Sequence, residues 1–196
     1  MDPAFPEPFT TTPAASGPVK DEESIPSSYP GTRVFQSVDD LVASRVVPTA
    51  ELLAPAAIPA GYGFAGAYVV ALDNGKVVDV SLSYRRVDHR YAGTLPEVFS
   101  PDLSIGWTSR APEPLPAETE ATDLGLGRKA LPRVKVHVRG YDGVFAEVTN
   151  PDSIDQDLVV LSSVNWFDKD GRLWYVQAAE PLDTMLQLAD SLKEPG

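Results

Sequence analysis

The strongest structural signal in the sequence is a pair of apolar runs on either side of a tight turn. Phe64–Asp73 and Lys76–Arg85 flank Asp73-Asn74-Gly75, and Asn-Gly between such runs is the typical signature of a β-hairpin. In the second run apolar and polar side chains alternate, and this period of two predicts one buried face and one solvated face. The apolar positions are Val78, Val80, Leu82 and Tyr84, and the polar ones are Asp79, Ser81, Ser83 and Arg85. This hairpin requires an antiparallel sheet.

Further segments extend the predicted sheet, and a helix is expected near each end of the folded region. The other predicted strands are Leu103–Ser109, Val134–Arg139, Gly143–Thr149, Leu158–Phe167 and Leu173–Ala178. Ser37 is a capping residue for a helix to about Val46. A second helix follows Pro181, because its apolar residues recur at helical spacing: Leu182, Met185, Leu186, Ala189 and Leu192. We therefore predict an α+β fold, a curved antiparallel β-sheet with a short N-terminal helix and a C-terminal amphipathic helix packed on one face.

Residues 1–32 form a tail in this interpretation, and residues 33–193 form a single domain. The tail is acidic and rich in Pro, Ser and Thr, without a run that could bury a helix or strand face. Residues 110–122 form a polar, Pro-rich, flexible loop within the domain. The uncharged stretch Leu52–Leu72 is long enough to cross a membrane, but its Pro and Gly residues argue against a helix. It is interpreted as a strand end, a turn at Ile58–Tyr62 and a new strand.

Composition disfavours several classes of function. The chain has 16 Lys and Arg against 28 Asp and Glu, a formal net charge of −12, so nucleic acids and anionic lipid surfaces are poor partners. It has no Cys, which removes disulfides and thiolate chemistry. The sequence has no G-x-S-x-G motif that could supply a nucleophile for a catalytic triad with His89 or His137. We therefore interpret both as solvated histidines in a strand or loop. We expect a monomer that needs no cofactor.

Aromatic side chains on the predicted strands are the main candidates for ligand binding. They could line a concave face that binds an apolar or acyl ligand. Core packing under the C-terminal helix is the alternative use, because indoles are large and fill the cores of small domains. The candidates are Trp107, Trp166, Trp174 and Tyr175.

Asp152, Asp155 and Asp157 lie in one short segment and could supply the oxygen ligands that calcium prefers. The segment lacks the EF-hand pattern, and an acidic surface loop is the alternative. Two weaker signals are a small basic cluster around Arg85 and Arg86, which is expected to pair with the protein's own acids, and a glycine pair in Gly125–Ala130. A plain turn explains the glycines.

The C-terminal stretch resembles a recurrent bacterial pattern. A strand with Trp166 leads through a turn at Gly171 to a strand with Trp174 and Tyr175, and a helix ends in an Ala-x-Ser-Leu-like sequence. Three upstream motifs look like the same family's opening helix, turn and strand: Phe35–Asp40, Ile58–Tyr62 and Val80–Tyr84. The resemblance is to extracytoplasmic domains of membrane-anchored bacterial proteins, of the anti-sigma-factor and sporulation-associated type. These are similar to half-barrel lipoprotein-carrier and sigma-regulator sensor folds.

The resemblance implies an exported domain, tethered to the cell membrane by an anchor upstream of Met1, with the Pro-rich tail as its spacer. It implies no catalytic residue. We therefore expect a non-enzymatic extracytoplasmic sensing or binding domain that engages a protein partner or an apolar ligand. A small metal-dependent hydrolase and a structural module of a surface assembly are the alternatives.

Overall fold

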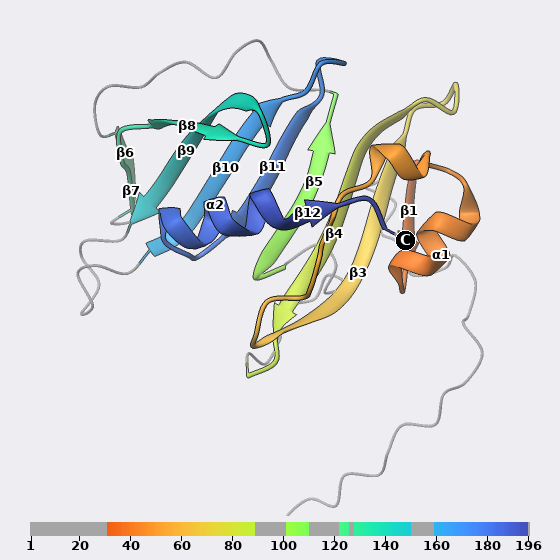
Figure 1. Cartoon of the computed structure of the whole chain (residues 1–196), viewed down its shortest axis with the longest axis horizontal. Coiled ribbons are helices and arrows are strands. Elements are labelled where there is room, and N and C mark those ends of the chain that lie inside the picture. Colours follow the sequence, from red (N-terminus) through yellow and green to blue (C-terminus); the bar gives the residue numbers. More distant parts are fainter. Residues whose placement is uncertain (1–30, 89–100, 110–121, 126–127, 150–158, 196) are drawn as a thin grey trace, which may run out of the picture.

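The computed structural model describes residues 31–88, 101–109, 122–125, 128–149 and 159–195. They form an α+β fold around one open antiparallel sheet of ten strands (Figure 1), whose order is β1-β3-β4-β5-β11-β10-β9-β7-β6, with β8 also paired to β9. The strands are β1 (Thr32–Phe35), β3 (Tyr62–Ala71), β4 (Val77–Arg86), β5 (Leu103–Thr108), β6 (Thr122–Gly125), β7 (Arg128–Ala130), β8 (Val134–Val138), β9 (Tyr141–Thr149), β10 (Val159–Phe167) and β11 (Leu173–Ala178).

Helices cover one face of this sheet. In Figure 1, α2 (Leu182–Ser191) crosses in front of β10 and β11, and α1 (Val38–Ser44) lies beside β1 and β3. A short 3₁₀ helix, η1 (Thr49–Glu51), follows α1, and the small strands β2 (Ala54–Pro55) and β12 (Leu192–Lys193) pair with each other. Leu41 of α1 and Met185 of α2 belong to the same buried cluster as the apolar residues of β3, β4, β5, β10 and β11. The predicted fold class and its two helices are confirmed.

The predicted hairpin is present as β3 and β4. Gly75 has a positive φ of 79°, which glycine adopts without strain, and the Asn74 Oδ1 accepts a hydrogen bond from the Lys76 amide at 2.9 Å. Strand β3 begins and ends two residues earlier than the predicted Phe64–Asp73, and β4 begins and ends one residue later than the predicted Lys76–Arg85. The stretch Leu52–Leu72 contains β2, a turn and β3, as expected. No helix among the described residues is long and apolar enough to cross a membrane.

Local signals place both helices. The Ser37 hydroxyl accepts the Asp40 amide at 3.0 Å and caps α1. That helix ends at Ser44 instead of about Val46, because Arg45 takes the left-handed conformation with φ 54°. Helix α2 starts after Pro181 and buries Met185, Leu188 and Ala189.

Three features of the fold differ from the predictions. Strand β1 contains Thr32, which the sequence placed in the tail, and β6 begins at Thr122, which it placed in the loop. The predicted solvated face of β4 is wrong at Ser81 and Ser83, which are 1% and 0% exposed. The reason at Ser81 is a hydrogen bond with Tyr175 of the distant strand β11. In addition, strands β1, β6, β7 and β12 have no counterpart among the predicted strands.

Candidate binding surface

The three tryptophans form a row across three neighbouring strands, on the face that packs under the helices. Trp166 of β10 lies opposite Trp174 of β11, which lies opposite Trp107 of β5. The Trp166 and Trp174 rings stack with centroids 6.3 Å apart and an interplanar angle of 11°. Their exposed fractions are 2% for Trp107 and Trp166 and 5% for Trp174. The strands therefore bring the three predicted indoles together as part of the core.

The indole N–H groups of two of these residues are satisfied inside the protein. Trp107 donates to the carbonyl oxygen of Glu51 at 2.8 Å, and Trp174 donates to Asp168 Oδ2 at 2.9 Å. Arg172 contacts both residues of the first bond. Its Nη2 lies 2.7 Å from Glu51 Oε1, and its guanidinium lies 5.1 Å from the centre of the Trp107 ring. These contacts tie the β10–β11 turn to η1 at one end of the row.

Asp168 is the centre of this turn. Burial alone raises the pKa of its carboxyl, but hydrogen bonds from Trp174 and from the amides of Arg172 and Asp170, together with the Arg172 charge, hold that pKa below its usual value. The carboxylate thus replaces water as the partner of a core indole and of two backbone amides.

We expect Asp168→Asn to lower the free energy of unfolding at pH 7 by about 1–2 kcal/mol, because hydrogen bonds to a charged acceptor become bonds to a neutral one. The folded-state pKa lies below the usual 3.8, so this carboxylate stabilises the fold above about pH 4 and loses its effect as pH falls through the folded-state pKa. Urea unfolding at pH 7 and pH 3 measures both points.

The matched control for Asp168→Asn is Asp170→Asn, in the same turn, whose side chain is 53% exposed. It should change stability by less than about 0.5 kcal/mol at either pH. An equal loss for Asp168→Asn at pH 7 and pH 3 would contradict the assigned role of the charge.

Tyr175, the fourth predicted aromatic, points to the opposite face of the sheet. Its cross-strand neighbours are Gly106 on β5, Ser81 on β4 and Tyr68 on β3. The phenol crosses over Gly106: a Cβ there would lie 2.8 Å from the Tyr175 oxygen. Burial raises the pKa of Tyr175, which also hydrogen-bonds Ser81 and Tyr68. This contact accounts for the buried Ser81 on the face predicted to be solvated, and it separates Tyr175 from the indole row.

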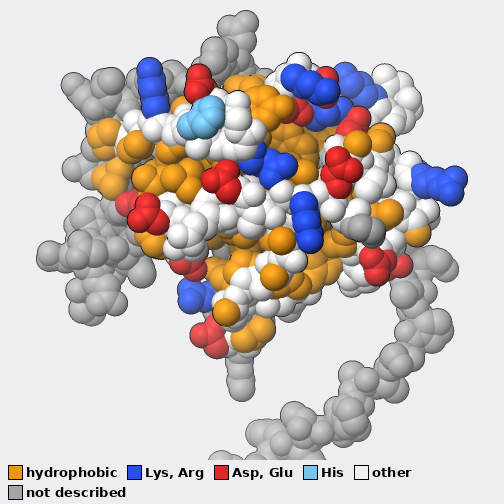
Figure 2. Space-filling view, in the orientation of Figure 1, with side chains coloured by type: hydrophobic (Ala, Val, Ile, Leu, Met, Phe, Trp, Pro, Cys, Tyr) orange, Lys and Arg blue, Asp and Glu red, His pale blue; other side chains and the backbone are white. Residues whose placement is uncertain are grey.

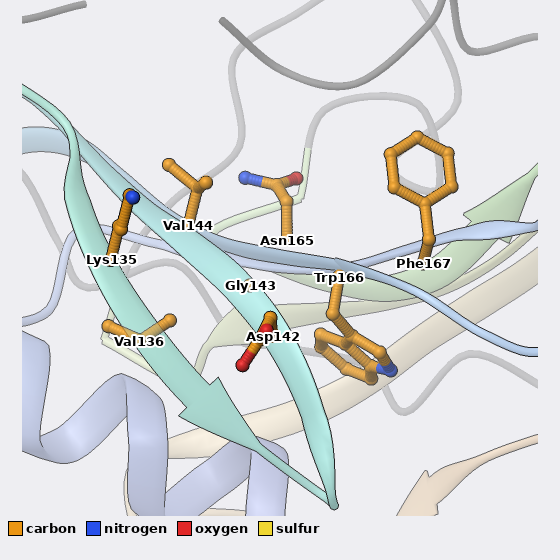
Figure 3. Close-up of a pocket in the computed structure, with 8 residues that line it drawn as sticks. All are labelled: Lys135, Val136, Asp142, Gly143, Val144, Asn165, Trp166 and Phe167. Atoms are coloured by element: carbon orange, nitrogen blue, oxygen red, sulfur yellow. The ribbon is translucent and has the colours of Figure 1, made fainter. Parts of the chain in front are cut away.

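A depression of about 350 Å³ lies over β8, β9 and β10 on the Tyr175 side of the sheet (Figure 3). Lys135, Val144, Asn165 and Phe167 extend to one side of the strands in Figure 3, whereas the Trp166 side chain extends to the other. His137 is exposed on β8, and its Nδ1 lies 3.4 Å from Asp142 Oδ1. Both side chains of this pair are largely exposed to solvent.

An exposed apolar loop projects between β2 and β3. We call residues 56–61 (Ala-Ala-Ile-Pro-Ala-Gly) the 56–61 loop. Ile58 is 47% exposed, and Val87, whose amide donates to the Gly61 carbonyl at 2.9 Å, is 76% exposed. Hydrophobic side chains gather over the lower part of the molecule in Figure 2, where Figure 1 shows the start of β3. Clustered exposed apolar residues of this kind mark interaction sites.

Two grooves flank the 56–61 loop. The Phe64 groove, about 400 Å³, lies towards α1 and the C-terminal end and is lined mainly by Val38, Pro55, Ile58, Phe64 and Tyr84. The Tyr62 groove, about 370 Å³, lies towards α2, and its lining residues include Pro59, Tyr62, Leu103, Glu180 and Leu188. The loop supplies residues to both grooves, so one partner could contact all three features.

The sequence interpretation treated the 56–61 loop only as a turn. The turn itself is confirmed, since the Tyr62 amide donates to the Pro59 carbonyl at 3.1 Å. The available signal for a surface role was the unbroken run of uncharged residues at a turn, where polar residues are usual. Glu180 and Tyr62 had no local signal, because they meet only when the start of β3 lies beside the segment between β11 and α2.

Other predicted residues fall partly outside the described structure. Asp152, Asp155, Asp157 and His89 lie outside the described residues, so the calcium site stays a prediction. Within the described ranges, no group of three or more His, Asp or Glu residues could hold a metal ion. Arg85 and Arg86 pair with Asp102 and Asp88, at 3.4 Å and 4.0 Å, as expected.

Comparisons with known proteins give no relative for this chain: no protein-family model, no curated protein and no solved structure matches it.

Proposed function

We propose that this chain is a non-enzymatic binding domain that engages a protein partner through the 56–61 loop and its two flanking grooves. The observation that carries the proposal is the exposed apolar loop, with Ile58 at 47% and Val87 at 76% exposure beside it. A well-packed domain rarely leaves contiguous apolar groups in water unless they meet another molecule. A protein interface combines such an apolar centre with a polar rim, and both grooves have polar groups at their edges.

The packing of the indoles favours a protein partner over an enclosed apolar ligand. An acyl ligand needs a cavity lined by apolar side chains that are free to contact it. Trp166 stacks on Trp174 instead, all three indoles belong to the buried core, and Trp107 and Trp174 also donate their indole N–H groups within the protein. The apolar surface open to a partner therefore lies in exposed side chains such as Ile58 and Val87 at the loop.

We further propose that the domain is extracytoplasmic and tethered to the cell membrane, with the Pro-, Ser- and Thr-rich residues 1–32 as a spacer. The support is this composition and the resemblance to extracytoplasmic domains of membrane-anchored bacterial proteins. The outer envelope of the cells is made permeable while the cytoplasmic membrane stays intact. Added protease should then degrade the protein while a cytosolic marker survives. Protection of the protein together with that marker would contradict the location.

Site-specific photo-crosslinking in the cells of origin tests the proposed surface. A benzophenone amino acid in place of Ile58 should give one discrete cross-linked protein, since this side chain would lie within the interface. The control position is Lys169, which is also exposed but lies in the β10–β11 turn. No cross-link at position 58, or the same cross-linked protein from both positions, would contradict the proposal.

A further inference from the structure

The Tyr62 groove combines an apolar floor with a single carboxylate at its edge. Leu103, Ala178 and Leu188 form the floor and are 1%, 1% and 9% exposed. Ala57, Pro59 and Ala60 of the 56–61 loop form one wall, and the polar side chains of α2 form the other. Glu180, just before α2, is held in place because the Tyr62 hydroxyl donates to its Oε1 at 3.0 Å. A groove of this kind suits a ligand with an apolar stem and a polar end.

The charges around this groove favour a cation at that polar end. Helix α2 carries Asp183 and Asp190 and has no basic residue. Glu180 and Asp183 together outweigh the half positive charge of a helix N-terminus. One cation beside the groove is Arg86, whose guanidinium lies 5.8 Å from the centre of the Tyr62 ring, and it is paired with Asp88 at 4.0 Å. The whole chain, at a net charge of −12, also favours a basic partner.

The single carboxylate discriminates between the two basic side chains. An arginine fork binds a carboxylate best through two parallel hydrogen bonds, which need both oxygens. Oε1 of Glu180 accepts the Tyr62 hydroxyl, so an arginine fork would have to share that oxygen with the phenol. Burial and Glu180 raise the pKa of Tyr62 to about 12, so this phenol remains a donor at neutral pH. A lysine ammonium needs one oxygen, and its four-carbon stem can cover apolar surface.

We propose that the Tyr62 groove receives a lysine side chain of the protein partner, with its methylene stem between the 56–61 loop and Leu188 and its ammonium group on Glu180. This inference rests on the proposed function. It names which side chain of the partner binds in one of the two grooves that flank the 56–61 loop. The pair is partly exposed, so it contributes to the choice of partner more than to total affinity.

Titration with capped tripeptides tests the inference on the intact chain. The probes are Ac-Ala-Lys-Ala-NH2, its norleucine analogue, which has an apolar stem and no charge, and its arginine analogue. Methyl resonances of Ala57, Ala60 and Ala178 report binding in NMR spectra. The lysine peptide should shift them saturably and bind about fivefold more tightly than the norleucine and arginine peptides.

Substitution of the carboxylate completes the test. Glu180→Gln should reduce the lysine peptide to the affinity of the norleucine peptide, whereas Asp73→Asn, which removes an exposed acid in the β3–β4 turn, should leave all affinities unchanged. Well-dispersed spectra of both variants show that they are folded. Equal affinities for the lysine and norleucine peptides, no saturable shift, or undiminished lysine binding by Glu180→Gln would overturn the inference. A cross-link from position 58 would still support the proposed function in each of these cases.

Discussion

Replacing Gly106 by Ala is expected to destabilise the domain by at least about 3 kcal/mol, because the added methyl group has no room. A Cβ at this position would lie 2.0 Å from the Val80 carbonyl oxygen and 2.8 Å from the Tyr175 hydroxyl oxygen. The first contact is with backbone of the neighbouring strand, which cannot move without separating β4 from β5. Urea unfolding followed by tryptophan fluorescence measures the loss.

A matched substitution in β3 separates this close approach from the general effect of a strand alanine. A Cβ at Gly63 would meet only Val87 Cγ1 at 3.7 Å, which is an ordinary contact. Gly63→Ala should therefore change stability by less than about 1 kcal/mol, in either direction. The double variant Gly106→Ala, Tyr175→Phe should remain destabilised, since the clash with the backbone persists. Similar stabilities for Gly106→Ala and Gly63→Ala would contradict the close approach of the β4 backbone and of Tyr175 to Gly106.

Truncating Trp166 is expected to cost about 3–5 kcal/mol, the range for removing a large aromatic side chain from a core. Trp166 is 2% exposed and stacks on Trp174, so an alanine there would leave a cavity under α2. The loss should appear as a lower urea midpoint with an unchanged slope.

Leu161→Ala on the same strand is the control, because Leu161 is 43% exposed, and it should cost less than about 1 kcal/mol. A similarly small cost for Trp166→Ala would mean that the indole lines a space that the chain does not fill. The prediction of an apolar-ligand site at the tryptophans would then gain support.

Sequence patterns predict most of the fold where the signal is local. Asn74-Gly75 and the alternation from Val78 to Tyr84 identify the first hairpin, and the Ser37 cap identifies α1, because each depends on neighbours a few residues away. Helix α2 follows from its spacing of apolar residues. Strand β1 has only four residues and is defined by pairing with β3, more than thirty residues later, so no local pattern indicates it.

The site is less predictable, because it depends on contacts between distant strands. The alternation in β4 assigns Ser81 to water, but Tyr175 reaches it across Gly106 from a strand about ninety residues away. The sequence identifies the three tryptophans, and both of their uses were open from sequence alone. Only their register across β10, β11 and β5 places them in one row, in which Trp166 and Trp174 stack. Likewise, Glu180 becomes a candidate only when its hydrogen bond to Tyr62 is known.

Native mass spectrometry of the chain, purified without denaturation from the cells of origin, tests the central claim that binding occurs at the 56–61 loop and not within the tryptophan row. The account predicts that the polypeptide, 21.1 kDa for these 196 residues, has the same mass before and after denaturation. Extra mass in the range of a fatty acid or lipid, released on denaturation and lost in Trp166→Ala, would contradict it. The row of Trp107, Trp166 and Trp174 would then be a ligand cavity.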